Sequence, residues 1–450
     1  MRSLFRLPVL LLILVGVAAG ALGPATLAQA ARAHVVRAFG REGTRFLPRS
    51  LPETSGVALL GDGRVLFAGG EEMVALLPSG EIDPRFGEDG HAHIVQPPNG
   101  IVERPTVTVD PQGRPVAASG VGVEPRGEGV LTGSRFLPFV ERFTVAGRLD
   151  RSFGGGDGYV ASDLDLPGSA DGEPAESFFD EVGFDAAERL VATGTTRVDV
   201  AQPGGGVTQV GTGFLARFDA GGQLDPTFAA GGLFLPRNGE SLATAGVVGP
   251  GNEVTVGTQS ESGRLRSVLR VGEDGVPDPG FGTYGYVPSL FGSEFTPLAV
   301  DRQGRTVAYA YVEGVEHRLA NGLRLKRLLP DGALDRGFGS GGTATLRIPR
   351  FYVADLALDS RGRVLLAVTL KRRGPIGEPE DLALLRLRAD GRVDKSFGED
   401  GTLRIPWPHR SDPALYLEGI DVRGGRAAIA ATDCGGDCQP TISLVALGSG

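Results

Sequence analysis

Several residue types are scarce in this chain of 450 residues. It contains two cysteines, five histidines and one tryptophan, and lysine occurs only at Lys326, Lys371 and Lys395. Two thiolates alone are too few ligands for a structural zinc site. The net charge of −9 argues against nucleic acid as a partner, because phosphate backbones bind basic surfaces.

Catalytic motifs are missing as well. The sequence has no nucleophile elbow, no His-Glu-x-x-His motif and no phosphate-binding glycine loop between a strand and a helix. We therefore predict no catalytic residue, no metal ligand and no cofactor. A site assembled from single residues of several repeats would leave no such motif, so an enzyme stays open as an alternative.

Long apolar runs are absent beyond the first thirty residues. There, two arginines precede an apolar run over 7–22, and a small-residue Ala-Gln-Ala site ends at Ala30. This layout predicts a secretory signal peptide at 1–30, with an uncleaved membrane anchor as the alternative. The mature chain, 31–450, would be secreted or held in the cell envelope, carry a net charge of −11 and have no membrane span.

The two cysteines stand close together, as Cys434 and Cys438 in the stretch CGGDC. In an exported protein such a pair can close a small disulfide. We therefore predict a disulfide between them.

What the chain has in abundance is turn residues and a repeat. Its 71 glycines and 31 prolines are dispersed, which favours short strands joined by many turns. A Phe-Gly signature recurs at intervals of 47 to 75 residues, about 60 on average. The marker residues are Phe39, Phe86, Phe153, Phe228, Phe281, Phe338 and Phe397.

Each interval predicts four antiparallel strands. Two apolar stretches flank an Asp-x-x-Gly-Arg turn, as in Leu356–Arg363 and the residues after it, which is a hairpin signal. A third strand follows a loop of variable length, and the signature turn then leads into a short fourth strand, such as 401–406. One such sheet cannot hide both of its faces, so it has to stack on neighbouring sheets.

The two ends of the mature chain together supply one further repeat. The chain ends on a predicted third strand, Ile442–Leu447, and begins with a signature and fourth strand at 38–47. Pairing these ends closes a ring, whereas a linear solenoid would need polar caps. We predict an all-β fold, a seven-bladed β-propeller of four-stranded antiparallel blades, whose last blade is closed by the N-terminal strand.

The signature residues have structural reasons to recur. The Asp accepts nearby backbone N–H groups, the Phe packs between blades, and the Gly adopts positive φ. The alternative role, metal binding by the Asp series, is disfavoured because one residue per blade is dispersed around the ring. The residues are Asp83, Phe86, Gly87, Asp150, Phe153, Gly154, Asp225, Phe228, Asp278, Phe281, Gly282, Asp335, Phe338, Gly339, Asp394, Phe397 and Gly398.

The repeat resembles that of the delta-60 family, which reads roughly Asp-Gly-x-Leu-Asp-x-x-Phe-Gly-x-Gly-Gly and matches best at 331–342 and 390–401. This resemblance covers essentially all of the mature chain. It implies a secreted or surface propeller of bacterial type and no particular reaction. The chain departs from the pattern at Ala229, at Pro277 and at 246–254, where the Asp-x-x-Gly-Arg turn is absent, which puts the geometry of that blade in doubt.

In such a meander, the repeated turns lie on one side of the ring and the variable connections on the other. Loops displayed on a rigid scaffold commonly bind partners. We therefore expect a monomeric binding or structural module for a protein or glycan. The alternative is that these connections are solvent-exposed loops without a binding role. The rival class is an extracellular enzyme, similar to a quinone-dependent sugar dehydrogenase or a lyase, with its site at the mouth of the axial channel. The connections are 119–138, 161–180, 197–212, 312–322 and 371–381.

Three local features invite sharper readings. His91 and His93 lie on one side of a predicted strand and could share a metal, but the sequence identifies no third ligand near them. The acidic segment 162–176 could hold calcium, but its spacing matches no known calcium loop, and a solvated loop is the favoured interpretation. For two basic stretches, 371–374 and 317–328, a solvated face is the favoured interpretation and an anion contact is the alternative. The candidate calcium ligands are Asp163, Asp165 and Asp171.

Overall fold

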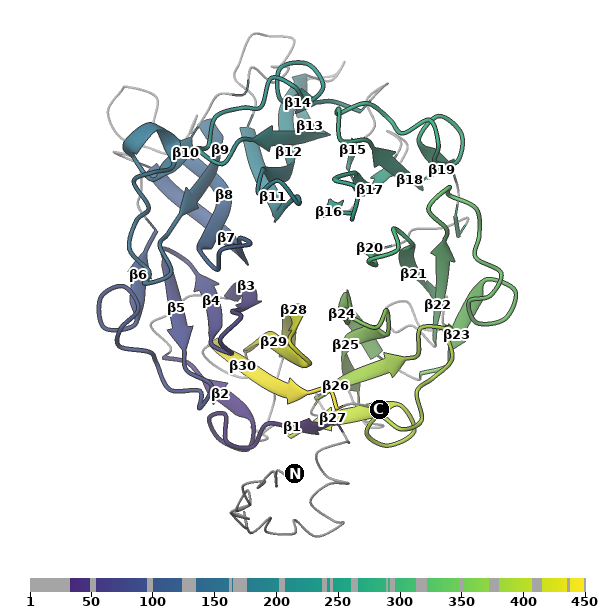
Figure 1. Ribbon diagram of the computed structural model, residues 1–450. Helices are drawn as coiled ribbons and strands as arrows, with labels where there is room; N and C mark the ends of the chain where they lie inside the picture. The colour runs from purple at the N-terminus through teal and green to yellow at the C-terminus, as the bar shows by residue number, and fades with distance from the viewer. Residues whose placement is uncertain are drawn as a thin grey trace, which may run out of the picture.

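Seven antiparallel sheets stand around a common axis in the computed structural model, and together they form a seven-bladed β-propeller (Figure 1). This confirms the fold predicted from the repeat. The structure describes residues 33–48, 54–94, 100–123, 135–161, 164, 176–201, 207–236, 241–242, 246–259, 266–288, 290–291, 296–312, 322–348, 351–371, 380–406, 415–434 and 438–448.

The first three blades are four-stranded meanders whose strands run from the axis outward. Blade 1 contains β3 (Thr54–Leu59), β4 (Val65–Gly69), β5 (Glu72–Leu76) and β6 (His91–His93). Blade 2 contains β7 (Gly100–Val109), β8 (Pro115–Val123), β9 (Arg135–Arg142) and β10 (Tyr159–Ala161), with a 3-10 turn, η1, at Gly154–Gly156. Blade 3 contains β11 (Glu176–Phe184), β12 (Leu190–Ala201), β13 (Val207–Phe218) and β14 (Leu233–Phe234).

The next three blades repeat this order, with one departure. Blade 4 has a divided inner strand, β15 (Ser241–Leu242) and β16 (Val247–Val248), followed by β17 (Val254–Gln259), β18 (Arg266–Val271) and β19 (Tyr286–Pro288). Blade 5 contains β20 (Thr296–Val300), β21 (Thr306–Val312), β22 (Gly322–Leu328) and β23 (Thr343–Leu346). Blade 6 contains β24 (Phe351–Leu358), β25 (Val364–Lys371), β26 (Glu380–Leu387) and β27 (Thr402–Ile405).

Blade 7 joins the two ends of the chain. Its inner strands come from the C-terminal end, and both N-terminal strands pair antiparallel with the last of them, so the prediction of ring closure is confirmed. Thr44 lies opposite Ser443, and their hydroxyl oxygens are 2.8 Å apart. The strands are β28 (Leu415–Arg423), β29 (Arg426–Asp433), β30 (Gln439–Ala446), β1 (His34–Val35) and β2 (Thr44–Phe46).

The Asp-x-x-Gly-Arg turns fold as the sequence predicts. In blade 2, Asp110 Oδ1 accepts the backbone N–H of Gln112 at 3.0 Å and of Arg114 at 2.7 Å. Gly113 adopts a φ of 82°, a conformation that costs a residue without Cβ little. The side chain thus closes the turn that joins the first strand to the second.

The inner strands carry a feature that the sequence did not predict. In every blade except blade 4, the first strand shifts register against the second, which is a β-bulge. A bulge inserts an extra residue, bends the strand and re-aims side chains. Six bulges therefore shape the strands that surround the axis, and the divided strand of blade 4 takes the place of the seventh.

The hydrophobic cores lie between neighbouring blades. Phe338 of blade 5 packs with Leu366 and Leu385 of blade 6, and Phe39 packs with Phe67 of blade 1. Each sheet therefore buries both of its faces, which is how a stack of sheets becomes stable. Among the described residues, no helix is long and apolar enough to cross a bilayer.

Candidate functional site

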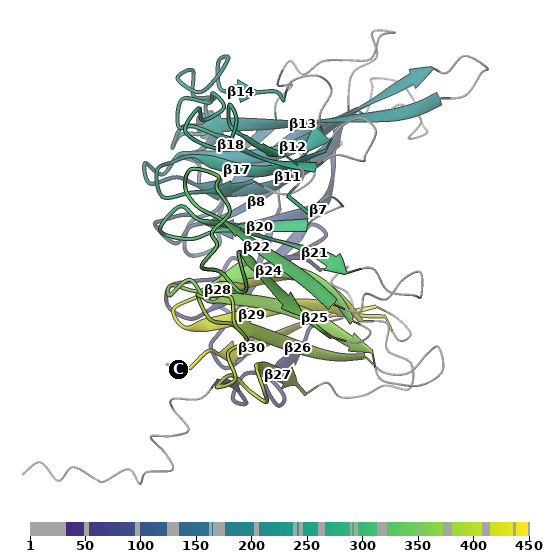
Figure 2. The same cartoon turned by 90° about the vertical axis from the view of Figure 1, so that its right-hand side faces the viewer.

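The two kinds of repeated turn share one side of the ring, as predicted (Figure 2). Their side chains contact each other directly. Arg64 of the first turn of blade 1 lies 3.3 Å from the signature carboxylate of Asp83, and Arg114 lies 3.3 Å from that of Asp150. We call this the repeated-turn side, and we call the opposite side the variable side.

Each signature Asp accepts the backbone N–H of the residue two positions later, in agreement with its expected role in the turn. These hydrogen bonds measure 2.8 to 3.2 Å in blades 1 to 6. The signature Phe side chains are buried, with exposed fractions of 0 to 1%. A Cβ atom on Gly391 of blade 6 would come within 2.8 Å of the Phe338 ring, so only glycine lets that turn lie on the ring.

The sequence analysis missed an arginine on the third strand, eight residues before the signature Asp. In four blades its Nε donates to the Asp at 2.8 Å. Its guanidinium also stacks on the signature Phe, with the carbon 4.3 to 4.7 Å from the ring centroid in these blades. The four arginines are Arg142, Arg217, Arg327 and Arg386. The constant spacing of eight residues was the signal that could have found them.

The same arginines join each blade to the next one. Arg142 Nη1 donates to the carbonyl oxygen of Ala220 at 2.7 Å, and Arg386 donates to that of Leu447. Burial lowers the pKa of both guanidinium groups. Burial also acts to raise the pKa of Asp150, but hydrogen bonds from Ser152 and the pairing with Arg142 outweigh it, so this pKa lies below its usual value. The repeated-turn side is therefore a set of inter-blade locks.

Blade 4 lacks part of this lock. Glu253 stands where other blades have the Arg of Asp-x-x-Gly-Arg, and Arg270 directs Nη1 to the carbonyl of Pro330 and Nη2 to that of Gly304. As a result, no arginine among the described residues hydrogen-bonds Asp278, which accepts the backbone N–H of Gly280 at 2.8 Å. The sequence departs from the repeat at 246–254, and the structure departs from the repeated lock in the same blade.

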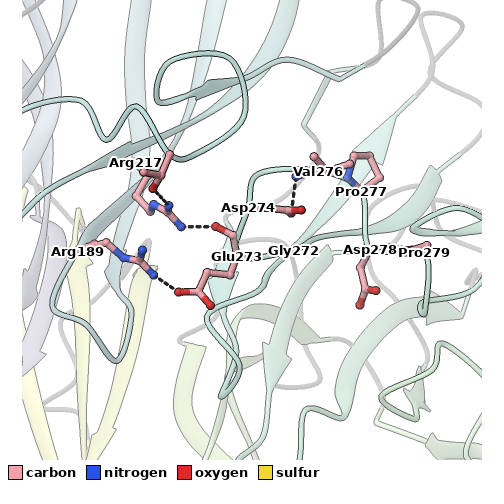
Figure 3. Close-up of a pocket in the computed structure, with 10 residues that line it drawn as sticks. Arg189, Arg217, Gly272, Glu273, Asp274, Val276, Pro277, Asp278 and Pro279 are labelled. Atoms are coloured by element: carbon pink, nitrogen blue, oxygen red, sulfur yellow. Dashed lines mark hydrogen bonds and ion pairs between the residues drawn. The ribbon is translucent and has the colours of Figure 1, made fainter.

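A cavity of about 690 Å³ lies where this blade meets blade 3 (Figure 3). One wall presents Arg189 and Arg217, and both contact Glu273: Arg189 Nη2 lies 2.5 Å from Glu273 Oε1, and Arg217 donates to its carbonyl. The lining residues are Arg189, Arg217, Thr227, Gly272, Glu273, Asp274, Val276, Pro277, Asp278 and Pro279. Sequence reasoning did not predict this cavity.

Acidic side chains also gather on the inner strands around the axis. Burial raises the pKa of Glu181 on β11 to about 8, and the charges of Asp355 and Asp180 add to the effect. Burial raises the pKa of Asp355 on β24 to about 6. Blades 3 and 6 face each other across the ring (Figure 1), so these charges act across its centre.

Two of the inner acids have a structural role. Asp421 Oδ2 accepts the backbone N–H of Leu59 at 2.6 Å and so links blade 7 to blade 1. Asp355 Oδ2 accepts that of Ile420 at 3.2 Å and links blade 6 to blade 7. Glu181 has no such link to a neighbouring blade among the described contacts.

The structure places a carboxylate beside the two histidines, where the sequence identified none. Glu72 on β5 lies with Oε2 3.1 Å from His91 Nδ1 and Oε1 3.5 Å from His93 Nδ1. The register of β5 and β6, in which Glu72 faces His93, brings them together. Within the described ranges, no three His, Cys, Asp or Glu residues are arranged to hold a metal ion.

The remaining predictions divide into three groups. Cys434 and Cys438 are joined by a disulfide. The reading of 317–328 as a solvated face is wrong at Arg327, which is buried against Asp335 because it is a lock arginine. The candidate calcium ligands Asp163, Asp165 and Asp171 lie outside the described residues, as do 317–321 of this basic stretch and 372–374 of the other.

The variable side is described only in part, and one of its connections is a strand pair. We expected a loop at 197–212, but β12 continues to Ala201 and β13 starts at Val207. Their twelve-residue pairing extends past the neighbouring blades on the variable side (Figure 2). The prediction of a loop was therefore wrong over most of this range.

No family model matches the chain, and no curated protein matches it in sequence. Solved structures with a similar arrangement include a protein of unknown function from Dyadobacter fermentans, 12% identical, covering 78% of this chain and 96% of that one, with a TM-score of 0.43. A putative glucose dehydrogenase from Thermus thermophilus is 15% identical over 89% of this chain and 99% of that one, with a TM-score of 0.36. A putative gluconolactonase is 12% identical over 92% and 97%, with a TM-score of 0.33. At these scores the similarities carry no argument about function.

Proposed function

We propose that this protein is an exported propeller of the delta-60 repeat type that binds a protein or glycan through its variable side. The contrast between the two sides supports the proposal. Side chains of the repeated-turn side are occupied by locks that recur from blade to blade, whereas the connections on the variable side differ from blade to blade. Rigid scaffolds that display unequal loops are typical of binding proteins.

The β12–β13 hairpin is the observation on which the proposal rests. Its twelve residue pairs run from Leu190 opposite Phe218 to Ala201 opposite Val207, longer than the other described strand pairs. The ring closes in the other blades with shorter strands, so the far end of this hairpin is not needed for closure. We assign that end to partner contact.

Shortening the hairpin tests the proposal. Replacing 197–211 with Asn-Gly leaves Thr196 and Thr212 as the closing pair of a two-residue turn. We expect the purified variant to keep the melting temperature of the parent and to lose binding to the polysaccharide or cell surface that the parent binds. The probes are peptidoglycan, chitin, cellulose and whole cells of the producing species, and Arg148→Ala on the repeated-turn side is the control.

Two results would count against a binding role on this side. One is a shortened hairpin that binds as well as the parent protein does. The other is a parent protein that binds none of the probes while remaining folded.

A second candidate, an enzyme that transfers a proton at the ring centre, is favoured by Glu181. A carboxyl group with a pKa of about 8 holds its proton at neutral pH and can act as a general acid. Screening sugar lactones and uronides for hydrolysis or elimination tests this candidate. Activity that survives Glu181→Gln unchanged would remove it.

A further inference from the structure

In the cavity between blades 3 and 4, the hydrogen-bond donors of the lining side chains are more fully paired than the acceptors. The donors of its arginines are largely taken: Arg217 bonds Asp225, Thr227 and the carbonyl of Glu273, and Arg189 bonds the carboxylates of Asp185 and Glu273. They therefore have little left to offer a ligand.

The acceptors of this cavity are less occupied. Asp274 Oδ1 accepts the backbone N–H of Val276 at 3.1 Å, and Asp278 Oδ1 accepts that of Gly280 at 2.8 Å. Among the described residues, the hydrogen bonds to these two side chains all end on Oδ1. Both side chains line the cavity and are at least partly exposed, so a ligand at this wall would meet two carboxylates that can accept hydrogen bonds from a positively charged donor.

The wall beside these carboxylates is apolar. Val276 is 52% exposed, and Pro277 and Pro279 also line the cavity. Tyr284 lies in the later turn of the same signature segment, outside the lining residues, and is 81% exposed; the next residue, Gly285, lies against Pro277.

Tyr284 also occupies a costly backbone conformation. Its φ is 50°, and blades 1, 5 and 6 have Asp89, Gly341 and Asp400 at this position, which tolerate positive φ better than an aromatic residue does. An exposed aromatic held in this way adds an apolar face and a ring that attracts cations.

We propose that this cavity binds an organic cation, an ammonium or guanidinium group on an apolar stem. The carboxylates of Asp274 and Asp278 would accept its N–H donors, and Val276, Pro277 and Tyr284 would cover the stem. The cavity lies on the repeated-turn side, so the inference is independent of the proposed function on the variable side. Such a cation can come from a basic peptide or from an amino sugar.

Calorimetric titration with three probes tests the inference: tetralysine, a glucosamine tetramer and its N-acetylated counterpart. We expect saturable binding of tetralysine, of the glucosamine tetramer or of both, weakened by salt, and no binding of the neutral tetramer. Binding of only one charged probe would identify the source of the cation. The inference is overturned if no charged probe binds, or if the neutral tetramer binds equally well.

Three variants separate the cavity from the general acidity of the protein. Asp278→Asn should weaken binding by about tenfold or more, because a charge-assisted hydrogen bond is lost. Asp331→Asn, at the position of Asp274 in the turn of blade 5, should bind like the parent protein. Equal weakening by both would overturn the inference. Tyr284→Gly should weaken binding and yet raise the melting temperature, since glycine relieves the positive φ, and unchanged binding would exclude the ring from the site.

Discussion

Replacing Glu181 with Gln should make the protein more stable, and the gain should depend on pH. The folded protein holds the Glu181 proton up to a pKa of about 8, whereas the unfolded chain releases it near the ordinary value of 4.5. Between these values the folded state binds more protons than the unfolded state. The contribution of Glu181 to the free energy of unfolding therefore falls as the pH rises through this window and is level above it.

The size of the effect follows from the same shift. Each pKa unit corresponds to about 1.4 kcal/mol, so a fully enclosed carboxyl would cost about 3 kcal/mol at pH 7. Glu181 retains some contact with solvent at the ring centre, which screens the charge, so we expect about 2 kcal/mol. Glutamine cannot ionise, keeps a similar shape and removes this cost.

Urea unfolding followed by circular dichroism, at pH 4.5, 6 and 8, measures the difference. The Glu181→Gln protein should match the parent at pH 4.5 and exceed it increasingly at pH 6 and pH 8. Glu399→Gln, which removes an exposed carboxylate in the turn side of blade 6, should run parallel to the parent. Parallel curves for Glu181→Gln as well would refute the reasoning that links the ring-centre acids to stability.

Three further predictions concern an inter-blade lock, a signature phenylalanine and the signal peptide predicted at 1–30. Arg386→Met should cost about 3 to 5 kcal/mol, because it leaves the carboxylate of Asp394 buried without its cation, and a normal unfolding midpoint would show that the lock is dispensable. Phe338→Ala should cost about 3 to 5 kcal/mol by opening a cavity between blades 5 and 6, with Phe338→Leu retaining most of the stability in the same denaturation assay. If the predicted signal peptide is removed, N-terminal sequencing of the protein recovered outside the cytoplasm should begin at Ala31. A sequence that begins at Met1 would show that residues 1–30 stay attached.

Most of the architecture could be predicted because the same sequence pattern recurs in each blade. The signature Phe marks every repeat, and the two chain ends complement each other, so blade number and closure follow from counting. The third-strand arginine pairs with the signature Asp in four blades at the same spacing, yet it was not predicted because an arginine on a strand is usually expected to face solvent. Arg327 shows the error: it is buried because Asp335, Phe338 and the next blade supply its partners.

Features that occur in one blade only could not be predicted in this way. The contact of Glu72 with His91 and His93 depends on the register of β5 and β6, which sequence spacing does not fix. The gathering of Glu181 and Asp355 depends on bulges in strands three blades apart. The cavity beside Asp278 results from the loss of an arginine partner in blade 4, a departure that was visible in the sequence but whose consequence was not.

Closure of the ring by the two chain ends is the claim on which the rest depends, and a disulfide placed across that junction measures it. Thr44 and Ser443 are paired residues whose hydroxyl oxygens lie 2.8 Å apart, so Thr44→Cys combined with Ser443→Cys should cross-link in air without a loss of folding. Peptide mapping under non-reducing conditions should recover the fragment that joins the two ends. Thr44→Cys combined with Thr441→Cys is the control, because Thr441 lies opposite Phe46. If the Thr44–Ser443 cysteine pair stays reduced in the folded protein, whether or not the control pair cross-links, the N-terminal strand does not close blade 7 as described.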